Sequence, residues 1–214
     1  MVNIHQGQPL LTKGEPLGQA KAALILVHGR GGGPASITPL ISHLGAEGYA
    51  YLIPQAANQT WYPQRFLMPR EQNEPYLTSA LTVIDDLVKQ IEASQIPAER
   101  IVLLGFSQGA CLALEYAARH PRRYGGVIAY SGGLIGADNE LSGYPDSLEG
   151  TPVFIGCSDV DDHIPLERIK TTTATLQALG AQVTERIYPH LGHTINTDEI
   201  TFARDLLTQV QANA

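Results

Sequence analysis

Short apolar segments alternate with amphipathic segments along most of the chain. Apolar runs of strand length cover residues 22–27, 49–53, 101–104, 126–131 and 152–157, and residues 183–188 form the last predicted strand. Between these runs, apolar residues recur at helical spacing over 36–48, 75–93, 108–120, 165–179 and 198–210. Strands that alternate with helices in this way form a mostly parallel sheet with helices on both faces. The pattern therefore predicts an α/β fold.

Two stretches depart from this alternation. Residues 1–20 are interrupted by glycines and prolines, and they predict an irregular edge or a short hairpin. Residues 55–75 contain Trp61, Phe66 and Met68 without a clean period, and they are long for a connection that has no structure of its own. The aromatic side chains argue against disorder, so we expect an ordered and functional loop.

Length, composition and charge narrow the classes of protein. The 214 residues suit one domain, 1–214, because no repeat or linker divides them. A formal net charge of -7 and the lack of a basic run argue against nucleic acid or a stable membrane association. No apolar run approaches the ~20 residues of a membrane span, and residues 1–10 do not resemble a signal peptide. Cys111 and Cys157 lack C-x-x-C spacing, so we expect reduced thiols in a cytoplasmic protein.

One stretch combines a strand, a sharp turn and a helix. Residues 105–109 are Gly-Phe-Ser-Gln-Gly, and they lie between an apolar run and an Ala/Leu-rich helix. This is a G-x-S-x-G motif in the setting that makes a serine a nucleophile. A Cβ at Gly105 or Gly109 would collide with the neighbouring strand or the start of the helix. The motif therefore predicts that Ser107 is the nucleophile of an enzyme.

A serine hydroxyl needs a base that takes its proton and an acid that orients the base. We predict His193, in the loop after the last strand, as the base, and His190 is its competitor. The loop after residues 152–157 supplies three candidates for the acid, which are Asp159, Asp161 and Asp162. The residues alone leave the choice among these three open.

Backbone amides are expected to stabilise the oxyanion that forms when Ser107 attacks. The N–H of Gln108 follows the nucleophile directly, and the N–H of Arg30 lies in the glycine-rich loop after the first buried strand. That loop lacks the patterns of phosphate-binding loops, and no cluster of His, Cys, Asp or Glu has metal-ligand spacing. We therefore expect no cofactor and no metal.

The loop of residues 55–75, called the aromatic loop below, is expected to form a substrate pocket. Trp61, Phe66 and Met68, together with Leu134, would line an apolar pocket for one arm of the substrate. Ordinary packing over a loop explains the same aromatic residues equally well.

Four segments carry a resemblance to a known family. They are Leu-Val-His-Gly-Arg-Gly-Gly at 26–32, Gly-Phe-Ser-Gln-Gly at 105–109, Asp161 with Ile164-Pro165, and Gly192-His193. In these segments the chain resembles the phospholipase/carboxylesterase family of α/β-hydrolases, which contains bacterial carboxylesterases and acyl-protein thioesterases. The resemblance implies an α/β-hydrolase fold without a large cap domain. It also implies Asp161 as the acid, and Arg30 and Gln108 as oxyanion donors.

The chain departs from the family pattern at two positions. Asp161-Asp162 stands where the family usually has Asp-Pro, which keeps Asp159 open as the acid. Arg30 replaces the apolar residue that often follows His-Gly in thioesterases, so their substrate preference does not carry over.

The residues and the resemblance together predict a serine carboxylesterase. We expect it to hydrolyse small-molecule esters of short or medium chain length through an acyl-enzyme. The alternatives are a thioesterase or lysophospholipase that uses the same residues, and a non-catalytic ligand-binding protein on the same fold. Apolar residues near the pocket would suit a substrate or, equally, a second copy of the chain in a homodimer.

Overall fold

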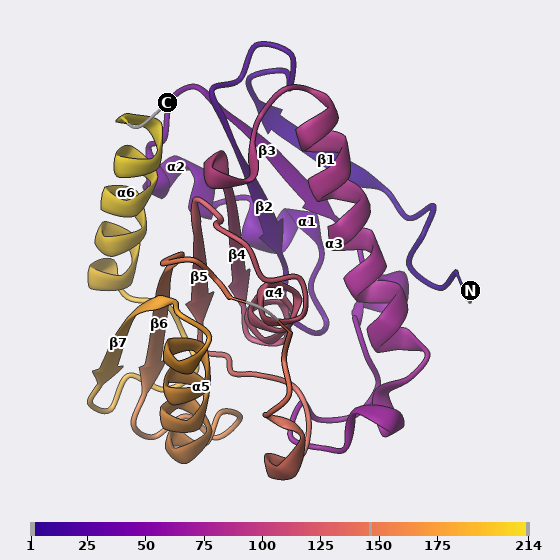
Figure 1. Cartoon of the computed structure of the whole chain (residues 1–214), viewed down its shortest axis with the longest axis vertical. Helices are drawn as coiled ribbons and strands as arrows, with labels where there is room; N and C mark the ends of the chain where they lie inside the picture. Colours follow the sequence, from indigo (N-terminus) through magenta and orange to yellow (C-terminus); the bar gives the residue numbers. More distant parts are fainter. Residues whose placement is uncertain (1–2, 146, 213–214) are drawn as a thin grey trace.

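A computed structural model describes residues 3–145 and 147–212 of the chain (Figure 1). Within these residues, seven strands form one sheet in the order β1-β3-β2-β4-β5-β6-β7. The strands are β1 Leu10–Gly14, β2 Ala22–Val27, β3 Tyr49–Pro54, β4 Ile101–Phe106, β5 Gly126–Tyr130, β6 Pro152–Ser158 and β7 Gln182–Tyr188. The edge strand β1 pairs antiparallel with β3, and all the other neighbouring pairs are parallel. The predicted α/β-hydrolase fold is confirmed, and no cap domain covers the sheet in the part of the chain that the structure describes.

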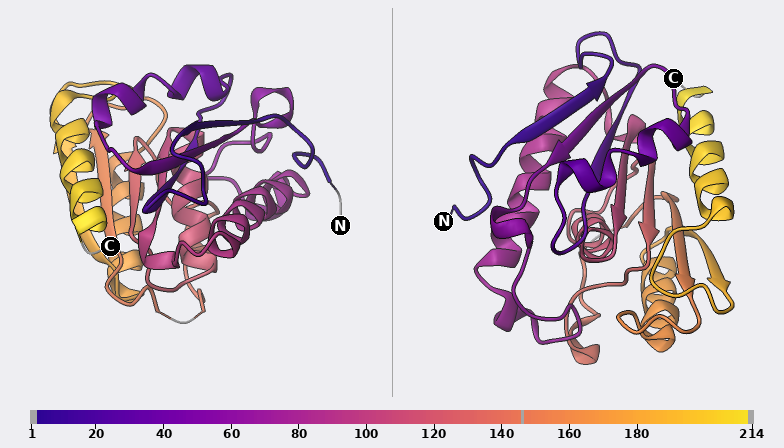
Figure 2. Two further views of the ribbon diagram at one scale, coloured as in Figure 1. Left: turned by 90° about the horizontal axis from the view of Figure 1, so that it is seen from above. Right: turned by 180° about the vertical axis from the view of Figure 1, so that it is seen from behind.

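Helices cover both faces of this sheet, as the two views of Figure 2 show. The longer helices are α3 Tyr76–Ala93, α4 Gln108–Arg119, α5 Leu166–Ala178 and α6 Thr197–Ala212. Side chains of α3, α4 and α5 pack on one face in the larger apolar cluster, while α6 and the short helices near the N-terminus pack on the other. Strands β2 to β5 are buried on both faces, which explains why their sequences are unbroken apolar runs.

Three local predictions can be compared with the structure, and the first of them is wrong. The single helix expected over 36–48 is two short helices, α1 Pro34–Ile37 and α2 Leu40–Leu44. Pro39 separates them because proline has no N–H to continue a helix, and Gly45 ends α2 with a φ of 59°. Residues 10–14 form an edge strand rather than a hairpin. The aromatic loop is ordered and contains two 3₁₀ turns, η1 Ala57–Gln59 and η2 Arg70–Asn73.

The expectations about the cysteines and about membrane spans can be compared with the structure. Both cysteines are buried free thiols, and burial raises the pKa of each to about 12. None of the helices in the described parts of the chain is long and apolar enough to span a membrane.

The start of α6 buries a carboxyl group. Glu199 and Asn196 bond reciprocally, since the Asn196 N–H donates to Glu199 Oε2 at 2.8 Å and the Glu199 N–H donates to Asn196 Oδ1 at 3.0 Å. Glu199 is fully buried, and its Oε1 has no hydrogen-bond partner among the described residues. A Cβ at Gly156 of β6 would lie 2.1 Å from this Oε1, so the glycine leaves room for the carboxyl. Burial raises the pKa of Glu199 from 4.5 to about 7.

This shift predicts how the stability of the fold depends on pH. Between about pH 4.5 and 7 the folded protein keeps the Glu199 proton while the unfolded chain releases it, so the free energy of unfolding falls as pH rises. Glu199→Gln removes this component. We expect the variant to gain stability relative to the wild type from about pH 5 to about pH 8 in urea unfolding. Parallel pH profiles for the two proteins would contradict a proton held on Glu199.

Candidate active site

Ser107 lies on a strained turn between β4 and α4. Its φ of 55° and ψ of -121° are unusual for a residue with a side chain. The turn persists because the Ser107 N–H donates to Tyr130 O at 2.9 Å and the Ser107 carbonyl accepts from the Cys111 N–H at 3.1 Å. The hydroxyl is therefore presented at the carboxyl edge of the parallel strands, where sites in such sheets are found.

The two glycines of the motif have a steric explanation. A Cβ at Gly105 would lie 2.3 Å from the backbone of Gly109, in the first turn of α4. A Cβ at Gly109 would lie 2.0 Å from Val27 O and 2.6 Å from His28 O. Any larger residue at either position would separate α4 from the strands beneath it, so the predicted reason for these glycines holds.

Three loops bring Ser107, His193 and Asp161 into one hydrogen-bonded row. His193 Nε2 lies 2.9 Å from Ser107 Oγ, and His193 Nδ1 lies 2.7 Å from Asp161 Oδ2. Ser107 follows β4, His193 follows β7 and Asp161 follows β6. The serine and the histidine are 86 positions apart in the sequence. The structure thus brings together the three residues that the sequence singled out.

Asp161 is held as a carboxylate. Burial acts to raise its pKa, but hydrogen bonds from His193 and from the amides of His163 and Ile164 outweigh burial and lower the pKa. The two amides donate to Oδ1 at 2.8 and 3.1 Å. An ionised carboxylate only accepts hydrogen bonds, so Nδ1 of His193 carries the proton. Nε2 is then the basic nitrogen, and it faces the Ser107 hydroxyl.

The competing residues lie elsewhere. Asp159 is exposed, and its Oδ1 accepts from the His190 N–H at 2.8 Å. His190 is also exposed, and so is Asp162, which follows Asp161 in the same loop. The two competitors Asp159 and His190 therefore fasten the loops after β6 and β7 to each other rather than contacting Ser107.

Substitution of the two acids separates their roles. We expect Asp161→Asn to slow phosphonylation of Ser107 by a fluorophosphonate by on the order of 10⁴, because the wrong imidazole tautomer would face the serine. Asp159→Asn, the matched control, removes a surface charge, keeps an acceptor for the His190 N–H and should react at the wild-type rate. The measurement is the second-order labelling rate, and equal losses in both variants would contradict the assignment.

The glycine-rich loop after β2 lies directly beside Ser107. A Cβ at Gly29 would lie 3.3 Å from the Ser107 Cβ. The neighbouring Gly31 N–H donates to Gln59 O at 2.7 Å, whereas the Arg30 N–H has no acceptor among the described residues. As the first residue of α4, Gln108 also has an N–H without an acceptor in its helix. Both amides that were predicted to bind an oxyanion are therefore available next to the serine.

The side chains of Arg30 and Gln108 have a second role that the sequence did not reveal. The Arg30 guanidinium donates to the carbonyls of three consecutive loop residues at 2.7–2.9 Å, which are Tyr62, Pro63 and Gln64. Gln108 Oε1 accepts from the Trp61 N–H at 2.8 Å, and its Nε2 donates to Tyr62 O at 2.8 Å. The two residues that offer oxyanion amides thus also hold the aromatic loop over the site. No sequence signal reports such contacts, because they join segments far apart in the chain.

The contact between Gln108 and the aromatic loop gives a stability prediction. Gln108→Ala leaves the buried Trp61 N–H without a partner and removes one of the donors to the Tyr62 carbonyl, which we expect to lower the free energy of unfolding by about 1–3 kcal/mol. Gln90→Ala, on the exposed side of α3, is the control and should change it by less than about 0.5 kcal/mol. Urea unfolding measures both. Equal stability of the two variants would show that the loop does not depend on Gln108.

Three of the four predicted pocket residues do not line the space around Ser107. Trp61 is fully buried, and its Nε1 donates to His28 O at 2.9 Å. Leu134 is also fully buried, and Met68 does not reach the groove. Of the four, Phe66 alone lines it. The prediction was wrong for the other three, since Trp61 and Leu134 pack in the larger apolar cluster and Met68 lies outside the groove.

His28 joins two loops beside the site. Its Nε2 accepts from the Ala56 N–H at 3.1 Å, and its Nδ1 lies 2.8 Å from Gly29 O. Burial lowers the pKa of His28, so the ring is neutral and joins two loops.

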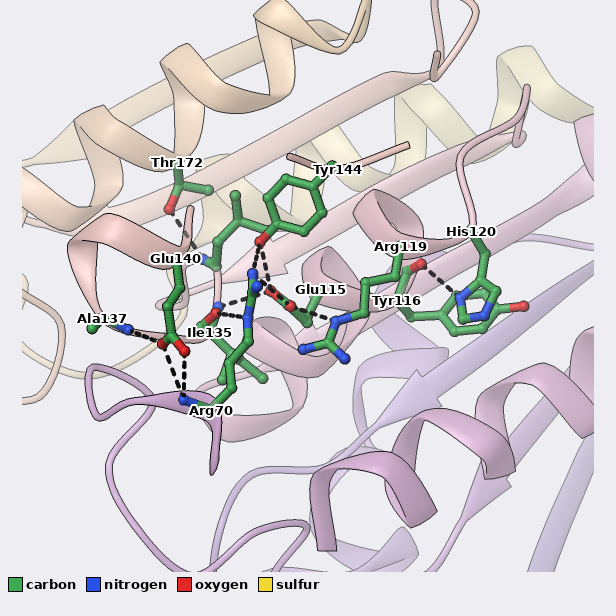
Figure 3. Close-up of polar contacts among 12 residues, drawn as sticks. Arg70, Glu115, Tyr116, Arg119, His120, Ile135, Ala137, Glu140, Tyr144 and Thr172 are labelled. Atoms are coloured by element: carbon green, nitrogen blue, oxygen red, sulfur yellow. Dashed lines mark hydrogen bonds and ion pairs between the residues drawn. The ribbon is translucent and has the colours of Figure 1, made fainter. Parts of the chain in front are cut away.

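A buried ion network supports the aromatic loop from below, as Figure 3 shows. Glu115 of α4 is fully buried and accepts from Arg70 at 3.1 Å and Arg119 at 2.7 Å. Its second oxygen accepts from the Ile135 N–H and the Tyr144 hydroxyl, each at 3.0 Å. The carboxylate is therefore fully compensated, and it connects the aromatic loop to the loop after β5.

Two grooves lie beside Ser107 and share the wall formed by Gly29, Arg30 and Phe106. The first, of about 440 Å³, contains Ser107 and His193 and is bounded by the aromatic loop. The second, of about 600 Å³, has an apolar lining that includes Ile37, Leu40, Ile195 and Ile200. Both volumes suit one arm of a small substrate. Among residues 3–145 and 147–212, no group of three or more His, Cys, Asp or Glu side chains is placed to hold a metal ion.

Comparison with known proteins reveals similarity over nearly the whole chain. A family model described as phospholipase/carboxylesterase matches residues 14–211. The crystal structure of a phospholipase/carboxylesterase from Dyadobacter fermentans superposes with a TM-score of 0.90 at 43% sequence identity, covering 94% of this chain and 97% of that one.

Two acyl-protein thioesterases are more distant relatives. The one from Neurospora crassa is 30% identical over 142 residues, which cover 65% of this chain and 58% of the relative. The one from Debaryomyces hansenii is 27% identical over 221 residues, covering 89% of this chain and 92% of the relative. This chain therefore spans little more than half the length of the Neurospora relative.

Proposed function

Because the chain belongs to the phospholipase/carboxylesterase family, a family of esterases and thioesterases, we propose that it is a serine hydrolase that cleaves carboxylic esters through an acyl-enzyme. The observation that carries the proposal is the position of His193, within hydrogen-bond distance of both Ser107 Oγ and the Asp161 carboxylate. That arrangement supports activation of the serine at neutral pH.

The proposed reaction has two halves. Ser107 Oγ attacks the acyl carbon while His193 Nε2 takes its proton, and Asp161 stabilises the imidazolium that forms. The amides of Arg30 and Gln108 bind the oxyanion of the tetrahedral intermediate. His193 then returns the proton to the leaving alcohol, and the acyl group stays on Ser107. Water that His193 deprotonates attacks the acyl-enzyme and releases the acid.

The grooves support small substrates of short or medium chain length. The wall formed by Gly29, Arg30 and Phe106 separates the groove over Ser107 from the apolar groove. The two arms of an ester bound at Ser107 would each occupy one of them. Their volumes of about 600 and 440 Å³ suit the arms of a small ester.

A series of p-nitrophenyl esters with increasing acyl length tests this function. We expect the highest kcat/KM for short or medium chains, and we expect Ser107→Ala to lower kcat by about 10⁵-fold or more because the nucleophile is lost. Measurement of released p-nitrophenolate decides. A wild type that does not exceed Ser107→Ala on any ester would refute the proposal and leave ligand binding as the better explanation of the fold.

Thioester hydrolysis is the second candidate, since relatives from two fungi are named acyl-protein thioesterases. Arg30 argues against a shared preference, because its guanidinium forms part of the wall between the two grooves. An oxygen ester and a thioester with the same acyl group discriminate the candidates. We expect the oxygen ester to be turned over with the larger kcat/KM relative to its uncatalysed rate, and the reverse order would favour a thioesterase.

A further inference from the structure

The grooves beside Ser107 differ in charge from the rest of this acidic protein. The formal net charge is -7, yet no Asp or Glu occurs among the lining residues of either groove. Three other hollows in the described surface each include at least one carboxylate, namely Glu92, Glu99 and Glu149 in one, Asp85 in another and Glu15 in the third. The lack of acids around Ser107 is therefore a local property of the site.

Two guanidinium groups line the groove over Ser107, and neither is neutralised by an acid. Arg30 and Arg65 form no ion pair with any described carboxylate, whereas the arginines below the loop, such as Arg70 and Arg168, do. The Arg30 guanidinium donates to three neutral carbonyls. These hydrogen bonds use its N–H groups, but no carboxylate in the described part of the chain compensates its positive charge.

Arg65 is the accessible member of the pair. Its side chain is exposed, and its Nη2 lies 3.5 Å from the carbonyl of His163 across the groove. The His163 ring packs edge-on against the His193 ring with centroids 4.7 Å apart. Arg65 and His193 thus contact the same residue, His163, the former at its carbonyl and the latter at its ring, and most of the Arg65 N–H donors have no partner among the described residues.

We propose that Arg65 binds a carboxylate of the substrate, so that the preferred substrate is an ester that carries a carboxylate on one of its two arms. This inference rests on the proposed ester hydrolysis. A guanidinium with free donors matches the two oxygens of a carboxylate. Arg30 adds a second positive charge to the same wall, and the apolar groove receives the uncharged arm.

Matched pairs of esters test the proposal. On the acyl side, mono-p-nitrophenyl glutarate is compared with its neutral methyl ester. On the alcohol side, 4-butyryloxybenzoate is compared with its methyl ester. We expect the charged member of one pair to have a kcat/KM about tenfold higher than its neutral partner at low salt, the effect of one partly exposed charge-assisted hydrogen bond. Added salt should reduce the ratio, since the site is open to solvent. The pair that shows the preference identifies the arm that Arg65 binds.

Two variants locate the source of the preference. Arg65→Gln should lower the charged-to-neutral ratio of kcat/KM, because Arg30 alone then faces the substrate carboxylate. Arg100→Gln removes the same charge at the opposite end of β4, next to Ile101, and should keep the preference.

The outcomes separate this proposal from the proposed function. Hydrolysis of the neutral esters without any preference for a charged one would overturn the proposal and leave ester hydrolysis intact. A preference of equal size in Arg65→Gln and Arg100→Gln would also overturn it. Failure of every ester to react faster than with Ser107→Ala would refute both.

Discussion

The close contact between the first turn of α4 and the end of β2 is the constraint on which the site depends. Gly109 packs so near the carbonyls of Val27 and His28 that no side chain fits between them. This contact forces the chain to reverse at Ser107 within one residue, which accounts for its positive φ. It also places the free amides at the start of α4 beside the loop that follows β2. The strained turn at Ser107 and the free amides beside it are therefore consequences of one packing contact.

Hydrogen bonds from the side chains of Arg30 and Gln108 hold the aromatic loop, which forms a wall of the site. The aromatic loop has few regular hydrogen bonds of its own, and its carbonyls and amides are paired instead by the side chains of Arg30 and Gln108. Below it, the buried carboxylate of Glu115 is compensated by two arginines. A loop held in this way forms a groove without a cap domain, and the same contacts explain why Trp61 became part of the interior.

Charge in the site follows a consistent physical logic. The only carboxylate in the row with Ser107 is that of Asp161, whose pKa is lowered by the hydrogen bonds it accepts, so its charge is committed to His193. The groove itself is lined by cationic and neutral groups. An environment of this kind favours the developing negative charge of an oxyanion and attracts anionic groups on a substrate.

The sequence by itself determined the fold class and most of the residues around the nucleophile. Buried parallel strands must be unbroken apolar runs, and a serine on a sharp turn requires glycines two residues away on each side, so both features are visible in the one-dimensional pattern. The same logic identified Ser107, and the family resemblance favoured Asp161. Tertiary structure decided between His193 and His190 and between Asp161 and Asp159, because each pair lies in one short loop and only the packing of strands β6 and β7 sets which side chain faces the serine. It also decided that Trp61 is interior and that Arg65 borders the groove. Those outcomes depend on contacts between segments far apart in the chain, which no local pattern records.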